Sequence, residues 1–595
     1  MSKKIQTLKN LMKEKGYDLY LVPSVDDHNN EYLPECWQYR RWISEFDGSA
    51  GDVLITLEDK SFLSTDGRYF SQAEYQLDNN EFTLLKQPGF ESKIEEWLIN
   101  NSNGKILALD PKKISIQKAE KLKKIAQQAG AKVIFDIDNL VEKTQVLLGE
   151  KVAIPNEKIF IHGLEYTGKS TESKINSIRD DLKKKCANAL VVSSLDDIAW
   201  VLNIRGRDIV HTPVAIAYLI VTLDDSYLYV DDDKLEPEIK IYLNSNNIAI
   251  KDYYEFYKDL AVYEANYLLD INSANYEMKQ AIHNQSNSKI LLTNSPITLN
   301  KASKNSVEIN GAKECHKKDA LAFIEWWKWM ENNYQSVDEI GAGIKLSEFR
   351  AQQEGYVEDS FNYIVGFADH SALPHYSPTV KTNRKITDQN VLLIDSGGQY
   401  KQGTTDITRV LHFGNPTAKQ KEFYTLVLKG HLNLSKAIFP KKTTGSQLDI
   451  LARESLWKNF ADFNHGTGHG VSSFLGVHEG PQRINSSSRV ELIPGMIISN
   501  EPGVYFPGEF GIRIENLIYI KETGHSSPTG HGPFYHFENL TLIPYDLNLI
   551  EKSLLTSVEK NIINDYHSKV KEEILPLVDK CTRDFLLSKL MPIND

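Results

Sequence analysis

The chain has 595 residues, which is too long for a single hydrophobic core and predicts roughly three or four domains. Its composition is that of an ordinary globular protein, with 41% hydrophobic and 25% charged residues. The formal net charge of −12 argues against an extended nucleic-acid-binding surface, because such a surface needs a basic face. We therefore expect no nucleic-acid partner.

The cysteines and the apolar stretches indicate the compartment. Four cysteines lie far apart and form no CxxC pair, so neither a zinc–thiolate site nor a disulfide framework is predicted: Cys36, Cys186, Cys315 and Cys581. The N-terminal stretch carries charge without a following apolar run, and no stretch approaches the ~20 apolar residues of a membrane span. These features predict reduced thiols, a cytoplasmic location and no membrane partner.

The first half of the chain alternates short strands with helices, which is typical of α/β domains. We expect one such domain over residues 1–150 and a second over residues 151–302. The order of helix, strand, turn and strand recurs between them without close sequence similarity, so our hypothesis is that both share one architecture. The predicted elements are helices at 5–15, 71–77, 173–185 and 196–202, and strands at 17–23, 53–57, 189–192, 215–221 and 226–230.

A polar, poorly periodic stretch at residues 294–309 marks the start of a third domain, predicted to span residues 303–595. Apolar residues at helical spacing predict a helix over residues 311–333, whose three tryptophans we expect in the core or in an interface. The tail at residues 550–590 predicts an amphipathic helical hairpin. The remaining predicted helices lie at 347–354, 418–438 and 445–460.

Acidic residues that can bind a cation gather between residues 391 and 516. Asp395 follows an apolar run and precedes a glycine-rich turn, and Asp406 begins a second β-branched run, so a hairpin or two adjacent strands should carry both acids. The other candidates follow on segments that are strand-like or flanked by glycine: His469, Glu501 and Glu515. Four carboxylates with one imidazole suit one hard dication or a pair of them.

Local patterns refine this set. His465 and His469 stand four residues apart, as two ligands on one helix would, but the surrounding glycines each make a helix unfavourable by ~1 kcal/mol. The two imidazoles therefore need not share a role. Strand alternation from Ile512 onward predicts that Arg513 and Glu515 lie on one face of a strand. Taken singly, each of these residues fits an ordinary turn or core position.

Taken together, the order and spacing of the five candidates resemble the metal ligands of the pita-bread metallopeptidases. Within that family the chain resembles the long, three-domain form of Xaa-Pro aminopeptidase (aminopeptidase P) over almost its whole length. The motifs that carry the resemblance are His465-Gly-Thr-Gly-His469-Gly-Val, Val477-His478-Glu479-Gly-Pro481, Gly511-Ile-Arg513-Ile-Glu515-Asn516, His375-Tyr376, Phe46-Asp-Gly-Ser-Ala-Gly51, Thr65-Asp-Gly-Arg68-Tyr-Phe70, Asn203-Ile-Arg205-Gly206 and Phe537-Glu538-Asn539-Leu540-Thr541-Leu542.

The resemblance implies an α/β (α+β) fold: two N-terminal creatinase-like α/β domains followed by a pita-bread catalytic domain with a C-terminal helical extension. It also implies a cofactor of two divalent metal ions, by family usage Mn²⁺, although Zn²⁺ or Co²⁺ suits the same ligands. Asp395 would hold one ion, His469 and Glu501 the other, and Asp406 and Glu515 both. A hydroxide that bridges the ions is the expected nucleophile.

The implied reaction releases the N-terminal residue from peptides with proline in second position. The resemblance assigns donation to the developing oxyanion to His375, contact with the scissile region to His478, and proton transfer to the leaving nitrogen to Glu501. The implied substrate contacts are, at the proline end, His465, Tyr505 and Arg513, and, elsewhere, Arg68, His375 and His478. The implied partners are peptides with an N-terminal Xaa-Pro and a second copy of the chain in a homodimer.

Two positions depart from the family pattern. Asn500 stands where relatives often carry Asp, which alters the charge next to Glu501. The loop of residues 365–370 also differs, which leaves the substrate preference open. Beside His478, Glu479 equally fits an exposed surface acid.

Other functions fit parts of the pattern. A prolidase, which cleaves only Xaa-Pro dipeptides, would use the same metal ligands, although the two upstream domains and Asn203-Ile-Arg205 favour the aminopeptidase. A non-catalytic pita-bread binding module typically lacks metal ligands, as does creatinase-like chemistry on the same fold. All five ligands are present here, which favours a metallopeptidase.

Overall fold

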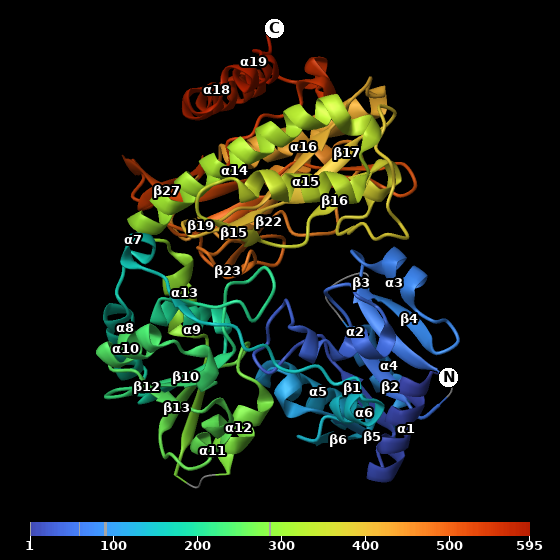
Figure 1. The fold of residues 1–595 in the computed structure, drawn as a ribbon, viewed down its shortest axis with the longest axis vertical. Helices are drawn as coiled ribbons and strands as arrows, with labels where there is room; N and C mark the ends of the chain where they lie inside the picture. Colours follow the sequence, from blue (N-terminus) through green and yellow to red (C-terminus); the bar gives the residue numbers. More distant parts are fainter. Residues whose placement is uncertain (1, 59, 88–91, 285–286, 595) are drawn as a thin grey trace. The chain divides into compact units, whose positions relative to one another are not determined.

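The computed structural model describes residues 2–58, 60–87, 92–284 and 287–594, which form two compact units (Figure 1). Unit 1 comprises Met1–His162 and Lys169–Ile297, and unit 2 comprises Gly163–Gly168 and Thr298–Asp595. The expected first domain falls in unit 1 and the expected catalytic domain in unit 2, whereas the expected second domain lies in unit 1 except for residues 163–168 and 298–302. Among the described residues, no helix has the length and apolar character to cross a membrane.

Unit 1 contains two six-stranded sheets of the same topology, with strand orders β4-β3-β2-β1-β5-β6 and β12-β11-β10-β8-β13-β14. In each sheet the three strands that come first in the sequence pair antiparallel: β1, β2 and β3 in one sheet, and β8, β10 and β11 in the other. All other strand pairs in the two sheets are parallel. The predicted recurrence of one architecture is therefore confirmed, although the sequence carries no close repeat.

The bounds of the main elements of unit 1 are close to the predicted ones. The first half contains α1 (Lys3–Lys15), β1 (Leu19–Val22), α2 (Tyr39–Ser44), β2 (Asp52–Thr56), β3 (Ser61–Asp66), α3 (Phe70–Gln76), β4 (Phe82–Gln87), α4 (Lys93–Asn101), β5 (Ile106–Leu109), α5 (Ile116–Ala129), β6 (Lys132–Phe135) and α6 (Leu140–Leu148). The second half contains β7 (Phe160–Ile161), α8 (Thr171–Lys184), β8 (Ala189–Val192), α9 (Leu195–Leu202), β9 (Ile204–Arg205), β10 (Ala217–Thr222), β11 (Ser226–Val230), α10 (Pro237–Ser245), β12 (Ala249–Lys251), α11 (Phe256–Leu260), β13 (Asn266–Asp270), α12 (Tyr276–His283) and β14 (Lys289–Thr293).

Unit 2 is a mixed layer of helices and antiparallel strands. Its helices are α7 (Leu164–Thr167), α14 (Ser306–Asn333), α15 (Glu339–Ala351), η6 (Ala368–Ala372), α16 (Ala418–Ser435), α17 (Gly445–Trp457), α18 (Ser557–Ile574) and α19 (Lys580–Lys589); α13 (Pro296–Ala302) straddles the boundary between the units. Its strands are β15 (Tyr356–Asp359), β16 (Ile364–Phe367), β17 (Leu392–Ser396), β18 (Gly398–Tyr400), β19 (Gly403–Thr404), β20 (Ile407–Leu411), β21 (Ile438–Pro440), β22 (Gly468–Gly470), β23 (Glu479–Ile484), β24 (Ile497–Asn500), β25 (Gly503–Phe506), β26 (Phe510–Arg513), β27 (Asn516–Ser526) and β28 (Pro533–Asn539).

The strands in the described part of unit 2 form four sheets, with orders β15-β18-β19, β16-β17-β20, β21-β28-β27-β24-β22-β23 and β25-β26. One core cluster joins α14 and α16 to the strands β17 and β20. Trp326 and Trp327 of α14 are fully buried in that cluster, which confirms their predicted core position. The core thus fixes the two strands that carry the first acidic candidates.

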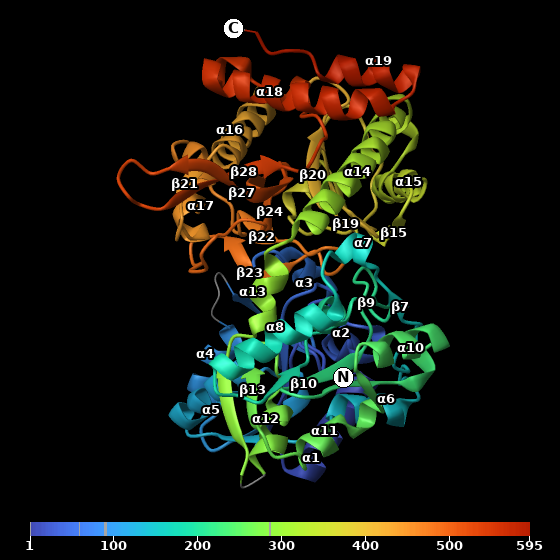
Figure 2. The same ribbon diagram turned by 90° about the vertical axis from the view of Figure 1, so that its left-hand side faces the viewer.

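Two helices of unit 2 differ from their predicted bounds, and the tail agrees with its prediction. α15 begins at Glu339 rather than at residue 347, and α16 ends at Ser435 because Ile438 joins strand β21. The predicted tail hairpin is confirmed: α18 and α19 lie side by side (Figure 2), and Phe585 of α19 packs edge-on against Trp327 with ring centroids 6.0 Å apart.

Candidate metal centre

Two aspartates lie on neighbouring strands, as predicted. β17 pairs antiparallel with β20 and sets Asp395 opposite Thr408, while Asp406 directly precedes β20. The flanking apolar residues Ile394 and Ile407 belong to the core, so the strands cannot turn their acids outward. Both carboxylates are consequently buried.

His469 enters the same space from strand β22. Its Nδ1 lies 2.9 Å from the carbonyl oxygen of Gly470, which can only accept, so Nδ1 carries a proton. Its Nε2 lies 3.4 Å from Asp406 Oδ2 and 3.6 Å from Glu501 Oε1. This imidazole therefore directs Nε2 at two carboxylates, which is the arrangement of a metal-binding histidine.

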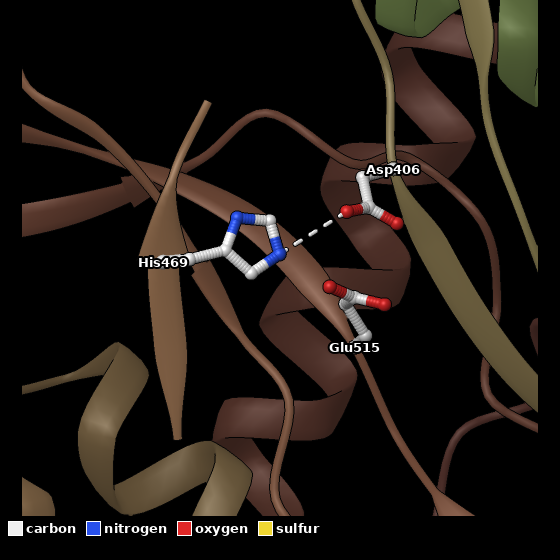
Figure 3. A group of neighbouring side chains, drawn as sticks. All are labelled: Asp406, His469 and Glu515. Atoms are coloured by element: carbon white, nitrogen blue, oxygen red, sulfur yellow. Dashed lines mark ion pairs between the residues drawn. The ribbon is translucent and has the colours of Figure 1, made fainter. Parts of the chain in front are cut away.

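One ligand atom from each of Asp406, His469 and Glu515 lies within 4.8 Å of the others (Figure 3). Glu515 reaches this point from a break between β26 and β27, and not from the continuous strand that the sequence predicted. At the break, the backbone N–H of Glu515 donates to Thr408 O at 3.1 Å. The predicted facing still results, because Ile512 and Ile514 pack into the core.

The electrostatics of the cluster show a shortage of positive charge. Burial raises the pKa of Asp395 to about 7, and burial together with the charges of Asp406 and Glu501 raises the pKa of Glu515 well above its usual value. Burial alone would lower the pKa of His469, but its hydrogen bond to Asp406 and the charge of Glu501 raise that pKa to about 9. Each carboxylate shift is that of a buried acid whose neighbours supply too little positive charge.

The residues of this cluster fit divalent cations. Oδ1 of Asp395 is buried and makes no hydrogen bond, which leaves a carboxylate oxygen to bind a ligand. A proton on His469 Nε2 occupies the direction in which a cation would sit, between Asp406 and Glu501. A donor set of four carboxylates and one imidazole offers mainly hard oxygen ligands.

A chain of polar side chains connects the candidate metal cluster with the residues predicted to orient proline. Arg513 donates from Nη2 to Asp395 Oδ2 at 2.7 Å and from Nη1 to the Tyr505 hydroxyl at 2.8 Å. The Tyr505 hydroxyl lies 2.9 Å from His465 Nε2, and His465 Nδ1 lies 2.8 Å from Gly466 O. Nδ1 must donate to that carbonyl, and in the neutral ring Nε2 then accepts from the Tyr505 hydroxyl. The hydrogen bonds run without a break from Asp395 to His465.

The other predicted residues lie in different surroundings. The ring of His478 lies edge-to-face against His469, with centroids 4.3 Å apart. His375 stands in the segment between η6 and β17. Arg68 belongs to unit 1, where its Nε and Nη2 each donate to Asp66 at 2.8 Å. The catalytic and substrate-binding roles of these residues stay predictions.

Sequence reasoning missed several residues that hold the candidate ligands. Thr408 Oγ1 donates to Glu515 Oε2 at 2.7 Å and accepts from Arg513 Nε at 3.1 Å. Ser499 Oγ donates to Glu501 Oε1 at 3.1 Å and accepts from the backbone N–H of His469 at 2.9 Å. Isolated hydroxyl residues in buried strands carry no spacing signal, so only the fold reveals them.

The interpretation of Glu479 as a surface acid is wrong. Its side chain is fully buried and forms an ion pair with Lys304, and its Oε2 accepts from Ser472 Oγ at 3.0 Å. These contacts fix the position of Glu479, which follows His478 in the chain. A buried carboxylate needs such partners, because an unpaired buried charge is costly.

Sequence profiles match four segments of the chain. The Creatinase/Prolidase N-terminal domain matches residues 4–144 and residues 150–308, Metallopeptidase family M24 matches residues 310–522, and the C-terminal region of peptidase M24 matches residues 533–593. The fold and the acidic cluster thus define a metallopeptidase of family M24 with two creatinase-type domains before it.

Curated relatives narrow this class. A protein of Sordaria macrospora named probable Xaa-Pro aminopeptidase P is 40% identical over 613 residues, which cover 99% of this chain and 99% of that protein. One of the same name from Fusarium vanettenii is 41% identical over 596 residues, covering 96% and 95%. The chain belongs to the Xaa-Pro aminopeptidase P family.

Solved structures agree with this family. The X-prolyl aminopeptidase from Caenorhabditis elegans, described as a cytosolic enzyme with a di-nuclear active site, covers 100% of both chains at 34% identity with a TM-score of 0.94. An Xaa-Pro dipeptidase from Bacillus anthracis covers 64% of this chain at 22% identity with a TM-score of 0.51, a likeness of fold alone.

Proposed function

We propose that this chain is a metal-dependent aminopeptidase that releases the N-terminal residue from peptides with proline in second position. The observation that carries the proposal is the convergence of Asp406, His469 and Glu515 within 4.8 Å, with Asp395 and Glu501 acting on the same cluster. It occurs in a chain that is 40% identical over its full length to proteins named Xaa-Pro aminopeptidase P.

In this proposal the five residues hold two divalent ions, with Asp406 and Glu515 shared between them. The prevalence of carboxylate oxygens supports Mn²⁺ as the native metal. The two ions, when bound, would activate water for attack and polarise the scissile carbonyl. Because Nδ1 of His469 donates to the carbonyl oxygen of Gly470, Nε2 is the nitrogen that would bind an ion.

Glu501 is the proposed carrier of the proton that reaches the leaving nitrogen. Ser499 Oγ donates to its Oε1 and so holds one carboxylate oxygen in place, while Oε2 lies 4.0 Å from His465 Nδ1. His478, whose ring packs against His469, is the proposed contact at the scissile region. His375 is the proposed donor to the oxyanion.

The preference for proline follows from what its amide lacks. An Xaa-Pro bond has no N–H for a peptidase to engage, so the site must recognise the pyrrolidine ring and its carboxyl side. The hydrogen-bonded chain of Arg513, Tyr505 and His465 is the proposed polar edge of that pocket. Arg68 is proposed as a further substrate contact from the first domain.

We also propose a cytoplasmic homodimer. The C. elegans structure is described as a cytosolic enzyme, and all four cysteines of this chain are free thiols. On the outer face of α17 and the turn after it, Ile450 and Trp457 are 41% and 48% exposed and Phe460 is fully exposed, a set of apolar side chains that a second copy would cover. Light scattering should give twice the chain mass of 67.7 kDa; the monomer mass would contradict the dimer.

The activity is tested with four peptides and mass spectrometry of the released amino acid. Metal-stripped protein returned to Mn²⁺ should cleave Xaa-Pro-Yaa and leave its N-acetylated form and Xaa-Ala-Yaa intact. Cleavage of the acetylated peptide would contradict the exopeptidase assignment. Activity confined to an Xaa-Pro dipeptide would identify a prolidase, and hydrolysis of none would identify a binding module.

A further inference from the structure

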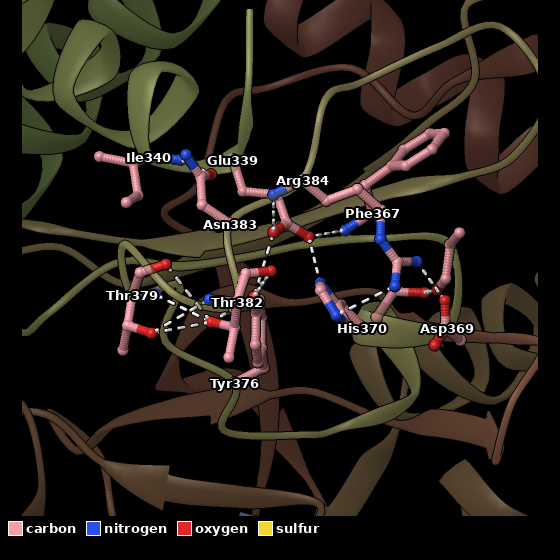
Figure 4. Close-up of polar contacts among 12 residues, drawn as sticks. Glu339, Ile340, Phe367, Asp369, His370, Tyr376, Thr379, Thr382, Asn383 and Arg384 are labelled. Carbon is pink, nitrogen blue, oxygen red and sulfur yellow. Dashed lines mark hydrogen bonds and ion pairs between the residues drawn. The ribbon is translucent and has the colours of Figure 1, made fainter.

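Glu339, the first residue of α15, is a fully buried carboxylate outside the metal cluster. Four donors converge on it, two on each oxygen (Figure 4). They are the backbone N–H of Phe367 and His370 Nδ1, both 2.8 Å from Oε1, and the Tyr376 hydroxyl and the backbone N–H of Arg384, at 3.1 and 3.0 Å from Oε2. Each oxygen of Glu339 thus accepts two hydrogen bonds. A buried carboxylate with so many donors holds several parts of the chain together.

All four donors belong to one segment, residues 367–384, and this segment carries His375. Tyr376, the residue that follows His375, is itself one of the donors. Glu339 therefore holds the chain on both sides of the proposed oxyanion donor. The backbone N–H of Glu339 also donates to Arg384 O at 3.0 Å, which closes a two-way contact between α15 and the end of the segment.

His370 acts here as a neutral, directional donor. Arg384 Nη2 lies 3.2 Å from His370 Nε2, and a guanidinium can only donate. Nε2 must then accept, so the ring proton sits on Nδ1 and is directed at Glu339 Oε1. Arg384 in turn forms an ion pair with Asp369, which fixes its guanidinium. The hydrogen-bond directions are determined from Asp369 through to Glu339.

The other side of the segment is fixed by strand β26, which ends at Arg513. The backbone N–H of Gly511 donates to Ser371 Oγ at 2.8 Å. A Cβ at position 511 would lie 2.0 Å from Ser371 O, so only glycine permits this close approach. The segment is thus held between α15 and the strand whose last residue is the proposed proline contact.

The backbone within the segment is strained. Ala368 has a φ of 55°, in the left-handed region, which is sterically unfavourable for a residue with a Cβ. Such a conformation persists only where the surroundings enforce it. Phe367, whose N–H donates to Glu339, directly precedes Ala368. The strain shows that the path of this segment is imposed by its contacts.

We infer that Glu339 is a positioning residue for the proposed hydrolysis, which acts by fixing the segment that presents His375. The inference rests on the proposed function, and it assigns Glu339 no contact with metal or substrate. A glutamine at this position would keep the volume but turn an NH₂ group toward two of the four donors. Those donors would then lose their acceptor, and the segment would lose its fixed path.

The test is a comparison of E339Q, H375A and the double variant in the Mn²⁺-loaded enzyme. E339Q should lower kcat on Xaa-Pro-Yaa by ~10–100-fold, the range found for partners that orient active groups. Its metal content should stay at the wild-type value and its KM within about threefold. The double variant should be no slower than H375A alone, because the two residues act through one group. A wild-type kcat in E339Q, loss of metal, or fully additive effects would overturn the inference.

A matched variant, D546N, separates the proposed positioning role of Glu339 from a general loss of protein stability. Asp546 is another buried carboxylate of unit 2 and accepts from the backbone N–H groups of His412 and Asn548 at 3.1 and 3.0 Å. D546N should lower Tm and keep the wild-type kcat; an equal loss of kcat would overturn the inference.

A milder variant covers the case in which E339Q does not fold. Y376F removes one of the four donors to Glu339, and should lower kcat several-fold without adding to H375A. An additive effect of Y376F would overturn the inference. If the wild-type enzyme itself cleaved no Xaa-Pro peptide, the proposed function would fail instead, and the two failures are therefore distinct.

Discussion

Replacing Thr408 by valine should weaken metal binding without touching a metal ligand. The Thr408 side chain is fully buried, and its Oγ1 donates to Glu515 Oε2 at 2.7 Å while it accepts from Arg513 Nε at 3.1 Å. Valine keeps the shape and removes both hydrogen bonds. Glu515 then loses the donor that orients it, and Arg513 loses one of its acceptors.

The expected magnitude follows from the type of bond that is lost. A hydrogen bond to a charged acceptor contributes ~1.5–3 kcal/mol, and ~1.4 kcal/mol is tenfold in an equilibrium constant. The affinity for Mn²⁺ should therefore fall by ~10- to 100-fold, which is the range usual for partners of metal ligands. Because Glu515 is proposed to serve both ions, both binding steps should weaken.

Calorimetric titration of the metal-stripped protein with Mn²⁺ measures this loss, and the Mn²⁺ dependence of the rate should shift in parallel. The matched control is Thr425→Val in α16, where a fully buried hydroxyl donates to Lys421 O at 2.7 Å and accepts from Glu551 N at 2.8 Å. The control should lose stability and keep its metal affinity. Wild-type affinity in T408V, or an equal loss in T425V, would refute the reasoning.

Three further predictions concern the cluster and its surroundings. Asp406→Ala should abolish hydrolysis and lower the bound metal by at least one ion per chain, since Asp406 is proposed to bind both ions. The circular dichroism spectrum of the metal-free protein should not change. Turnover at saturating Mn²⁺ would contradict this prediction. His375→Ala should lower kcat by ~10²–10³-fold with unchanged metal content, and loss of metal would instead make His375 a ligand. Burial lowers the pKa of His567 in the folded chain to about 4, from the usual 6.5 of a histidine. Between these two pH values the unfolded chain therefore takes up a proton at His567 and the folded chain does not. The free energy of unfolding should therefore fall between pH 6.5 and 4 by up to ~1.4 kcal/mol per pH unit, and urea unfolding of His567→Gln should show a weaker dependence; identical pH profiles would contradict the assignment.

Periodicity predicted the elements whose packing depends on one apolar face. The helix expected at residues 311–333 is α14, and the apolar positions that predicted it, such as Phe323 and Trp327, are the ones buried. The same signal failed for the start of α15, because Gly341 and Gly343 lower helix propensity by ~1 kcal/mol each. Packing explains the second glycine, since a Cβ at Gly343 would lie 2.3 Å from the ring of Tyr363.

For the candidate site, too, the sequence predicted one set of residues and missed another. Ligand-type residues with motif spacing were visible in the sequence, and the fold brings Asp406, His469 and Glu515 together. The groups that hold them were not visible, because Thr408 and Ser499 are single hydroxyl residues. Thr408 holds Glu515, 107 residues further along the chain, and Ser499 links Glu501 to His469, 30 residues before it. Their roles depend on which strands meet, and no local pattern encodes that.

The most direct test of the two-ion centre is anomalous diffraction from crystals of the Mn²⁺-loaded protein, recorded on both sides of the manganese absorption edge. Our account predicts two anomalous peaks per chain. One should be bound by Asp395, and the other by His469 and Glu501, with Asp406 and Glu515 contacting both. A single peak, or peaks away from these five side chains, would contradict the dinuclear centre.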